Sequence, residues 1–241
     1  MKRLITFTGG LLALFAVGLA SAEEFSGNVT LATDYRFRGI SQGDRSPAIQ
    51  GGVDLELDNG FYIGAWASNV TFSGGAIETD FYGGWSGAIS ETLNLDVGYL
   101  YYGYPEDDAD PALDYSEVYA SLSYSDFKVG LAYSPDYFAE TDTFFYLYGE
   151  YSHNLTEAIA LDVHVGLNKF AGDTEFASFI GPGPGEDPGD SYLDYSVGVS
   201  TAAFGLDLAA QFIGTNLNED ECFGDTKLCD DTIVLSVSKS L

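Results

Sequence analysis

Two arginines, Arg36 and Arg38, stand one residue apart in the stretch DYRFRGISQ at 34–42, although the chain has only 9 basic residues against 37 acidic ones. Residues at positions i and i+2 of a β-strand point to the same face, so this spacing predicts two guanidinium groups side by side. Two roles are open to such a pair. The arginines either balance nearby carboxylates, or they line a constriction whose transverse field orients permeating solutes.

The only two cysteines, Cys222 and Cys229, have six residues between them. In an exported chain they would meet an oxidising compartment, which favours a disulfide that closes this short segment. A metal site is the weaker alternative, because no histidine is near and the spacing differs from the paired Cys-x-x-Cys pattern of zinc sites. We therefore predict a disulfide between Cys222 and Cys229, no metal and no cofactor.

The acidic stretches PEDDADPALD at 105–114 and NEDECFGD at 218–225 raise the possibility of calcium binding. Neither has the alternating ligands and terminal glutamate of an EF-hand loop. Solvated surface charge is the simpler interpretation. Weak binding of divalent ions, bridging to lipopolysaccharide phosphates, is the alternative.

A hydrolytic enzyme would need a nucleophile and a base within about 3 Å of each other. The chain has two histidines, His153 and His164. His153 falls in a predicted turn, and His164 has no serine two residues away on its own predicted strand. No GxSxG stretch is present. We predict that the protein is not an enzyme, with an outer-membrane hydrolase as a weaker alternative.

The N-terminus has the features of a secretory signal peptide for the Sec pathway. Basic residues in MKR precede an apolar stretch at 4–19 and the small residues ASA at 20–22, which predicts cleavage before Glu23. The mature domain, 23–241, then keeps 9 − 2 = 7 basic and 37 acidic residues, a formal charge of −30. Such a charge excludes nucleic acid as a natural partner.

Alternation of apolar and polar residues is the strongest pattern in the mature chain. From Phe25 to Arg38 one parity is apolar and the other polar, which places Tyr35 and Phe37 on the apolar face and both arginines on the polar face. The pattern recurs near 47–58, 61–70, 77–89, 93–103, 114–124, 127–134, 142–152, 158–168, 191–201, 204–214 and 231–240. These are about twelve segments, each long enough to cross a bilayer as a tilted strand.

Connection lengths favour an all-β, up-and-down transmembrane barrel over a soluble sandwich. Short links such as DNG at 58–60, SET at 90–92 and HNLTE at 153–157 alternate with links that mostly run longer. Short periplasmic turns, longer extracellular loops and an even strand count are typical of outer-membrane barrels. Both termini are then periplasmic.

Charge placement supports the same fold. On the apolar parity the only charged residue is Lys239, near the chain end, where it can snorkel to the interface. A basic residue facing lipid at mid-bilayer costs about 2–4 kcal/mol. A soluble barrel would place its apolar face inward instead. The predicted lumen face, and with it the candidates for a constriction, comprises Asp34, Arg36, Arg38, Asp54, Glu56, Glu78, Asp80, Asp96, Glu117, Lys128, Glu150, Asp162, His164, Asp194 and Asp207.

Three segments resemble the TorF family of porin-like proteins: YRFRGISQ at 35–42, PAIQGGVDL at 47–55 and GFYIGAWASNV at 60–70. They cover only the first three predicted strands. The resemblance implies a Gram-negative outer-membrane β-barrel with a transport role. It brings no substrate and no binding residues, so Gln42, Gln50 and Asn69 match the pattern without assigned roles. The chain ends in Leu241, whereas such barrels usually end in an aromatic residue.

Together these features predict a channel in the bacterial outer membrane for passive passage of small polar solutes or ions. Its eleven lumen carboxylates against three basic groups predict a preference for cations. Outer-membrane lipid and lipopolysaccharide are the expected surroundings. The alternative is a poreless structural or receptor barrel that acts through its acidic loops, because twelve strands lie between a filled barrel and an open one. The loop at 169–190 either enters the lumen or stays outside.

Overall fold

The computed structural model describes residues 24–72, 76–105, 107, 109–183, 189–224 and 226–241. The predicted signal peptide, 1–22, lies outside the described residues. No helix among the described residues is long and apolar enough to cross a membrane.

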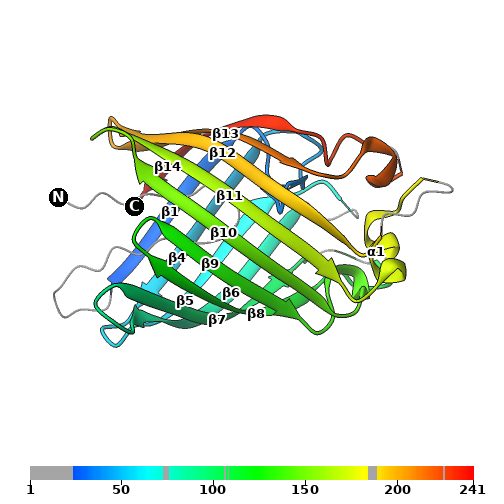
Figure 1. The fold of residues 1–241 in the computed structure, drawn as a ribbon, viewed down its shortest axis with the longest axis horizontal. Helices are drawn as coiled ribbons and strands as arrows, with labels where there is room; N and C mark the ends of the chain where they lie inside the picture. Colours follow the sequence, from blue (N-terminus) through cyan, green and yellow to red (C-terminus); the bar gives the residue numbers. More distant parts are fainter. Residues whose placement is uncertain (1–23, 73–75, 106, 108, 184–188, 225) are drawn as a thin grey trace.

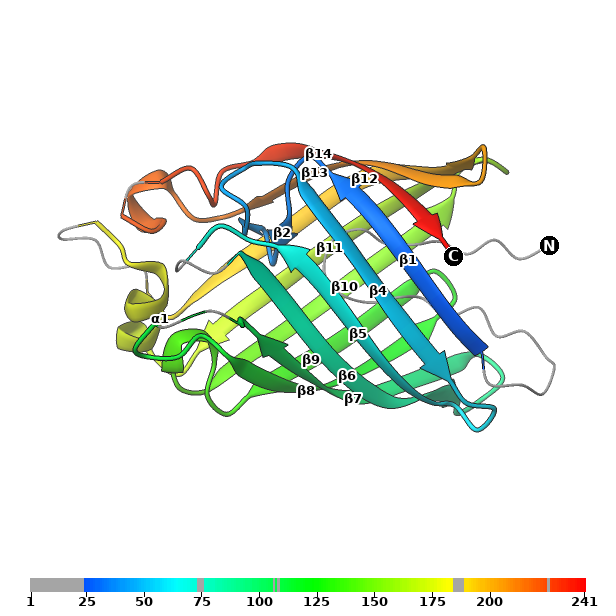
Figure 2. The same ribbon diagram turned by 180° about the vertical axis from the view of Figure 1, so that it is seen from behind.

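Twelve antiparallel strands close into one barrel (Figures 1 and 2), which confirms the predicted fold. Each strand pairs with its neighbours in the chain, and β1 closes the ring by pairing with both β14 and β4. The barrel strands are β1 Glu24–Ala32, β4 Ala48–Glu56, β5 Phe61–Asn69, β6 Ile77–Ala88, β7 Leu93–Gly103, β8 Tyr115–Tyr124, β9 Phe127–Ser134, β10 Phe144–Asn154, β11 Ile159–Phe170, β12 Ser191–Ala203, β13 Leu206–Thr215 and β14 Thr232–Ser240.

The two ends of the barrel differ in their connections. One end, which we name the termini end, carries the C-terminus, the start of β1 and the short turns 57–60, 89–92, 125–126, 155–158 and 204–205. The opposite end, the loop end, carries the longer connections and helix α1, Asp173–Ile180 (Figure 1). At the termini end Phe204 and Gly205 have φ of 57° and 73°, as a two-residue hairpin turn requires. His153, predicted in a turn, instead lies inside β10 and contacts Asp126.

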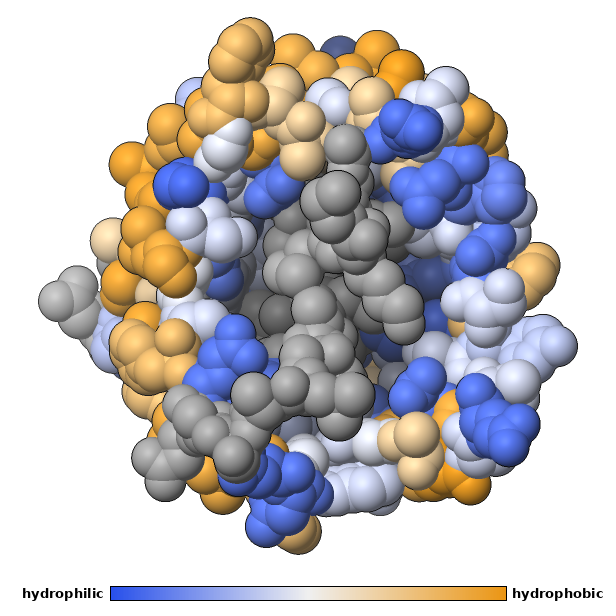
Figure 3. Space-filling view, turned by 90° about the vertical axis from the view of Figure 1, so that its left-hand side faces the viewer, coloured by the Kyte–Doolittle hydropathy of each residue, from blue (hydrophilic) through white to orange (hydrophobic). Residues whose placement is uncertain are grey.

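The outer face of the barrel is apolar. Side chains of one parity point outward, and several of them, such as Leu31, Ile63 and Phe81, are more than half exposed. Those of the other parity point inward and are mostly buried or half-buried. Figure 3 views the termini end, where hydrophobic residues form much of the outer margin and hydrophilic residues lie within it. Lys239 is on the outer face and donates a hydrogen bond to the carbonyl of Gly205.

The first predicted strand, 25–38, is wrong in its second half. The strand β1 ends at Ala32, and the next residues form a small hairpin of β2, Arg36–Phe37, and β3, Ile40–Ser41. Arg38 and Gly39 make its two-residue turn, with φ of 47° and 83°. Because Arg38 lies in a turn, it does not continue the face of Arg36. Alternation persists through this segment although the chain has left the barrel wall.

The faces predicted for Tyr35 and Phe37 are also wrong. Instead of facing lipid, Tyr35 is buried and donates a hydrogen bond to Glu78 at 2.7 Å. Phe37 packs edge-on against Tyr102, with ring centroids 5.6 Å apart. The apolar parity of 33–38 therefore reflects packing inside the barrel.

An aromatic cluster fills the loop end. Phe144 and Phe170, at the loop ends of β10 and β11, are fully buried, as are Phe176 and Ile180 of α1. The described part of loop 169–190 thus covers the loop end, and Phe176 packs on Phe170 with centroids 4.8 Å apart. Two short helices join the same end, η1 Phe138–Glu140 and η2 Glu219–Glu221. We call the cluster the aromatic cap; its rings include Tyr104, Tyr115, Tyr137, Phe138, Phe144, Phe170, Phe176, Phe179 and Tyr192.

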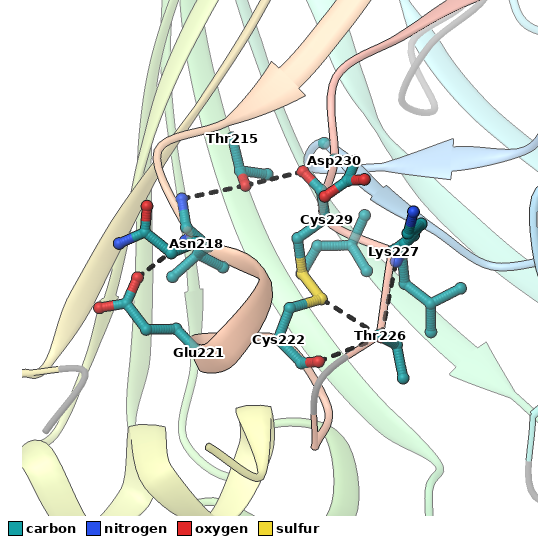
Figure 4. Close-up of a disulfide and its surroundings, with 12 residues drawn as sticks. Thr215, Asn218, Glu221, Cys222, Thr226, Lys227, Cys229 and Asp230 are labelled. Atoms are coloured by element: carbon teal, nitrogen blue, oxygen red, sulfur yellow. Dashed lines mark hydrogen bonds between the residues drawn. A yellow bond between two sulfur atoms is a disulfide. The ribbon is translucent and has the colours of Figure 1, made fainter. Parts of the chain in front are cut away.

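Cys222 and Cys229 form a disulfide in the connection between β13 and β14, with an S–S distance of 2.07 Å (Figure 4). Both cysteines are buried against the aromatic cap. The hydroxyl of Thr215, at the end of β13, donates a hydrogen bond to the carbonyl of Cys229 at 3.1 Å. The disulfide thus fixes a loop that packs on the barrel rather than a free surface segment.

Candidate functional site

A cavity of about 130 Å³ lies inside the barrel. It is lined by the β2–β3 hairpin and by the consecutive strands β5 to β13. Seven lining residues can carry charge: Arg36, Arg38, Asp96, Glu117, Glu150, His164 and Asp194. Seven others are tyrosines, namely Tyr62, Tyr82, Tyr102, Tyr119, Tyr146, Tyr148 and Tyr195.

Arg38, at the hairpin tip, is held by the barrel wall. Its Nη2 donates hydrogen bonds to both carboxylate oxygens of Glu117, at 2.8 and 2.9 Å. Both side chains are at most 6% exposed. Burial alone lowers the pKa of Arg38, but Glu117 and the nearby tyrosines outweigh it and hold that pKa above its ordinary value. The left-handed backbone of a non-glycine residue costs about 1–2 kcal/mol. This arginine is thus placed by its contacts and not by turn propensity.

Four aromatic rings surround the same guanidinium group. The Cζ atom of Arg38 lies 4.2 Å from the ring centroid of Tyr146, 4.7 Å from Phe37 and 4.9 Å from Phe144. The ring of Tyr137 is 5.7 Å away. Each distance is within the range of a cation–π contact. Glu117 and these four rings surround one cation on the sides away from the cavity, and we call this arrangement the guanidinium box.

Arg36 points to a different partner set. Its Nε contacts Asp34 at 2.6 Å, and its Nη1 donates to the carbonyls of Gly39, Leu228 and Asp230 at 2.9–3.0 Å. Two of these carbonyls flank Cys229 in the disulfide loop. Arg36 therefore joins the hairpin to that loop, and its Nη2 has no hydrogen-bond partner among the described residues. Burial lowers the pKa of Arg36.

A second charged cluster lies on β9 to β12. His164 Nε2 is 2.9 Å from Asp194 Oδ1, and its Nδ1 is 3.6 Å from Glu150 Oε1. Lys128 Nζ lies 3.5 Å from the other oxygen of Glu150. The hydroxyl of Tyr146 is 2.7 Å from His164 Nε2. Because both ring nitrogens of His164 face carboxylates, the arrangement suits a polar wall better than a serine–histidine nucleophile.

Tyrosine hydroxyls satisfy several of the predicted lumen carboxylates, and parity counting over charged residues alone missed them. Tyr62 donates to Asp96 at 2.7 Å, and Tyr82 donates to Asp54. The sequence did contain a pattern that predicts these lumen tyrosines. Tyr82 has the same parity as Asp80 on its strand, and other lumen tyrosines likewise share the parity of a neighbouring acid.

Glycines on the inner face let these rings lie flat on the wall. A Cβ atom on Gly64 would lie 2.4 Å from the ring of Tyr82, and one on Gly130 would lie 2.3 Å from the ring of Tyr148. At such distances a larger side chain would force the tyrosine ring to shift. The glycines therefore fix the positions of the tyrosines that line the cavity.

The remaining predicted residues lie on the inner face of the barrel wall but do not line the cavity. Asp162 accepts hydrogen bonds from Ser152 and Ser200 at 2.8 and 2.7 Å. Asp80 is fully buried, and neither of its oxygens has a hydrogen-bond partner among the described residues. Glu56 and Asp207 are half-buried near the termini end. No group of three or more potential metal ligands that could hold an ion occurs within the described ranges.

The model of one protein family matches residues 16–241, and its description is "Bacterial protein of unknown function (Gcw_chp)". The chain belongs to the Gcw_chp family. No curated protein matches this member of the family. The family description does not include the name TorF, so that resemblance stays a prediction.

Solved structures with the same fold include porins. The KdgM porin matches with 10% identity and a TM-score of 0.57, over 90% of this chain and 99% of that chain. The KdgM porin in complex with disordered oligogalacturonate matches with 9% identity, a TM-score of 0.55 and the same coverage. The NanC porin matches with 8% identity and a TM-score of 0.53, over 89% and 98% of the two chains. At these identities the likeness establishes the barrel fold.

Proposed function

We propose that this Gcw_chp protein is a porin-like channel of the bacterial outer membrane that passes small polar solutes or ions. One observation carries the proposal: a cavity lined by charged and tyrosine side chains lies inside a closed barrel whose outer face is apolar. Such a barrel buries its outer face in lipid and keeps its polar face for water and solutes. Export through a signal peptide at 1–22 and a mature domain of 23–241 belong to the same proposal.

The cavity charge supports a preference for cations. Among the charged lining residues, four carboxylates against two guanidinium groups leave a formal charge of −2, or −1 when His164 is protonated. Arg36 and Arg38 are each already paired with a carboxylate. Oligogalacturonate, present in one KdgM structure, is a polyanion. A polyanion would meet a lumen of the same sign here, so small cations are the better candidates.

Conductance in planar lipid bilayers tests the proposal. Purified, refolded protein is inserted, and the reversal potential is measured under a salt gradient. We expect discrete channel events with a reversal potential toward that of the cation. Selectivity for anions would reject the acidic-lumen account. A complete absence of events, with refolding shown by faster gel migration before boiling than after, would reject the channel.

A poreless structural or receptor barrel is the second candidate, and the aromatic cap that fills the loop end favours it. It predicts no conductance for wild type or for any variant that loosens the loop end. The hydrolase alternative predicts phospholipid hydrolysis that is lost in His164→Ala. Both barrel functions predict recovery with outer membranes, so recovery in the soluble periplasm would contradict either one.

A further inference from the structure

We propose that the guanidinium box is a binding site for the guanidinium or primary ammonium group of a small organic cation. Arg38 is its tethered occupant, and an arriving cation that displaces it releases the β2–β3 hairpin. This inference rests on the proposed channel. It adds the class of ligand that the channel binds and the way in which that ligand opens it.

The box has the chemistry of a site for an organic cation. Glu117 offers two carboxylate oxygens to one nitrogen of the guanidinium, at 2.8 and 2.9 Å. The hydroxyl of Tyr102 lies 3.3 Å from the same carboxylate. Rings of Phe144 and Tyr146 cover the cation at 4.9 and 4.2 Å. A carboxylate beside aromatic faces favours guanidinium and ammonium groups over strongly hydrated metal cations.

Most of the box belongs to the rigid wall and not to the hairpin. Tyr102, Glu117, Phe144 and Tyr146 lie on β7, β8 and β10. Stacking fixes the rings: Tyr102 lies on Tyr115 with centroids 4.3 Å apart, and Phe144 lies against a loop ring, Tyr137, at 4.0 Å. The site therefore persists when the arginine leaves it.

The hairpin is the part that can move. It has two residue pairs, and Arg38 forms its tip. The hairpin also touches the wall elsewhere, because a Cβ atom on Gly39 would lie 2.5 Å from the Thr215 side chain and Phe37 packs on Tyr102. On its other side the hairpin is tied to a loop, through Arg36, and not to the wall. When Arg38 leaves the box, the hairpin loses the ion pair between Arg38 and Glu117 that attaches it to the barrel strands.

A cation can approach the box from the cavity, since both Arg38 and Glu117 line it. Asp96, Glu150 and Asp194 line the same cavity and attract cations toward it. A tethered group competes at an effective concentration in the millimolar range or above. We therefore expect displacement by free guanidinium at about 10 mM or more, far below denaturing concentrations.

The experiment replaces sodium chloride stepwise with guanidinium chloride, up to about 50 mM at constant ionic strength, in planar bilayers. Wild type should show at least a threefold rise in open probability. Arg38→Ala should be open without guanidinium and show no further rise, and Glu117→Gln should behave in the same way. Arg45→Ala, which removes an exposed arginine from the same connection, should respond as wild type does.

A second readout does not depend on conductance. Amide hydrogen exchange of residues 34–42 should quicken at least fivefold when guanidinium is added to folded wild type, and should already be fast in Arg38→Ala. Channels in wild type that ignore guanidinium, with unchanged exchange at 34–42, would overturn the inference but keep the proposed channel. Silent bilayers with guanidinium-dependent exchange would reject the channel and keep the binding site.

Discussion

The barrel interior has two halves: the loop half lies toward the loop end, and the termini half lies toward the termini end. The same strands run through both halves, but the side chains that fill the interior differ. In the loop half, Phe144, Phe170 and Phe176 are fully buried beneath loops, and a disulfide and the hairpin complete the packing. In the termini half, the lumen side chains of Lys128 and Glu150 are 10% and 14% exposed, and cavity-lining tyrosines such as Tyr148 lie on the wall beside them.

This difference shows that a barrel of this strand count is not committed to being filled or open along its whole length. Twelve strands enclose more space than wall side chains alone can fill. Here loops and a folded-in hairpin supply the missing volume at one end, and polar residues with space for water occupy the other. The loop half therefore carries much of the stability and holds the guanidinium box, and the cavity extends from it into the termini half.

The largest effect should come from the aromatic cap. Phe144→Ala removes a fully buried ring and should lower the free energy of unfolding by about 3–5 kcal/mol. Its control is Phe204→Ala, which truncates a fully exposed ring in a termini-end turn and should cost below about 0.5 kcal/mol. Urea titration in lipid vesicles measures both. Equal losses of stability in the two variants would show that the aromatic cap contributes no more to stability than the termini end does.

The guanidinium box should come next. Glu117→Gln leaves a buried guanidinium without its counter-charge and should cost about 3 kcal/mol. Asp230→Asn breaks the exposed pair with Arg45, where solvent screens the charges, and should cost below about 1 kcal/mol. The same urea titration compares them. A larger loss of stability for Asp230→Asn than for Glu117→Gln would show that the Arg38–Glu117 ion pair contributes little.

Parity and connection lengths were enough to predict the barrel, because each strand must keep one face in lipid. They failed at 33–38 because alternation also suits a hairpin packed inside a lumen. One signal was available there: Gly39 directly follows Arg38, and a glycine at that place suits a tight turn. The pairing of Arg38 with Glu117 joins residues 79 positions apart, and no local pattern contains such a contact.

The tyrosine positions illustrate the other limit of sequence reasoning. Tyr62 and Tyr82 lie on the inner parity, but an aromatic residue suits either lipid or a lumen, so the residue type alone did not place them. Their hydrogen bonds to Asp96 and Asp54 depend on register between strands. The aromatic cap depends likewise on how the loops fold back.

The disulfide should contribute an intermediate amount. The double variant Cys222→Ser and Cys229→Ser opens a short loop and should cost about 2 kcal/mol. Alkylation of native protein should label neither cysteine until a reductant is added together with denaturant, because both are buried. Labelling without reductant would show that the thiols are free.

The smallest effect should come from the glycines beneath the tyrosines. Gly64→Ala pushes against the ring of Tyr82 and should cost about 1 kcal/mol. Gly149→Ala meets nothing within 4 Å and should stabilise the strand by about 0.5 kcal/mol. Urea titration should therefore show a lower free energy of unfolding for Gly64→Ala and a higher one for Gly149→Ala. A loss of stability in both would argue against flat tyrosine packing.

We expect the loop half to exclude bulky solutes and the termini half to admit them. Ser196 lines the cavity, and Ser196→Cys places a single reactive thiol there, because the native cysteines are paired. A bulky, membrane-impermeant thiol reagent is added to intact cells and to cells whose outer membrane has been permeabilised. We expect labelling only after permeabilisation, when the reagent reaches the termini end. Equal labelling in intact cells would contradict a loop half that excludes bulky solutes.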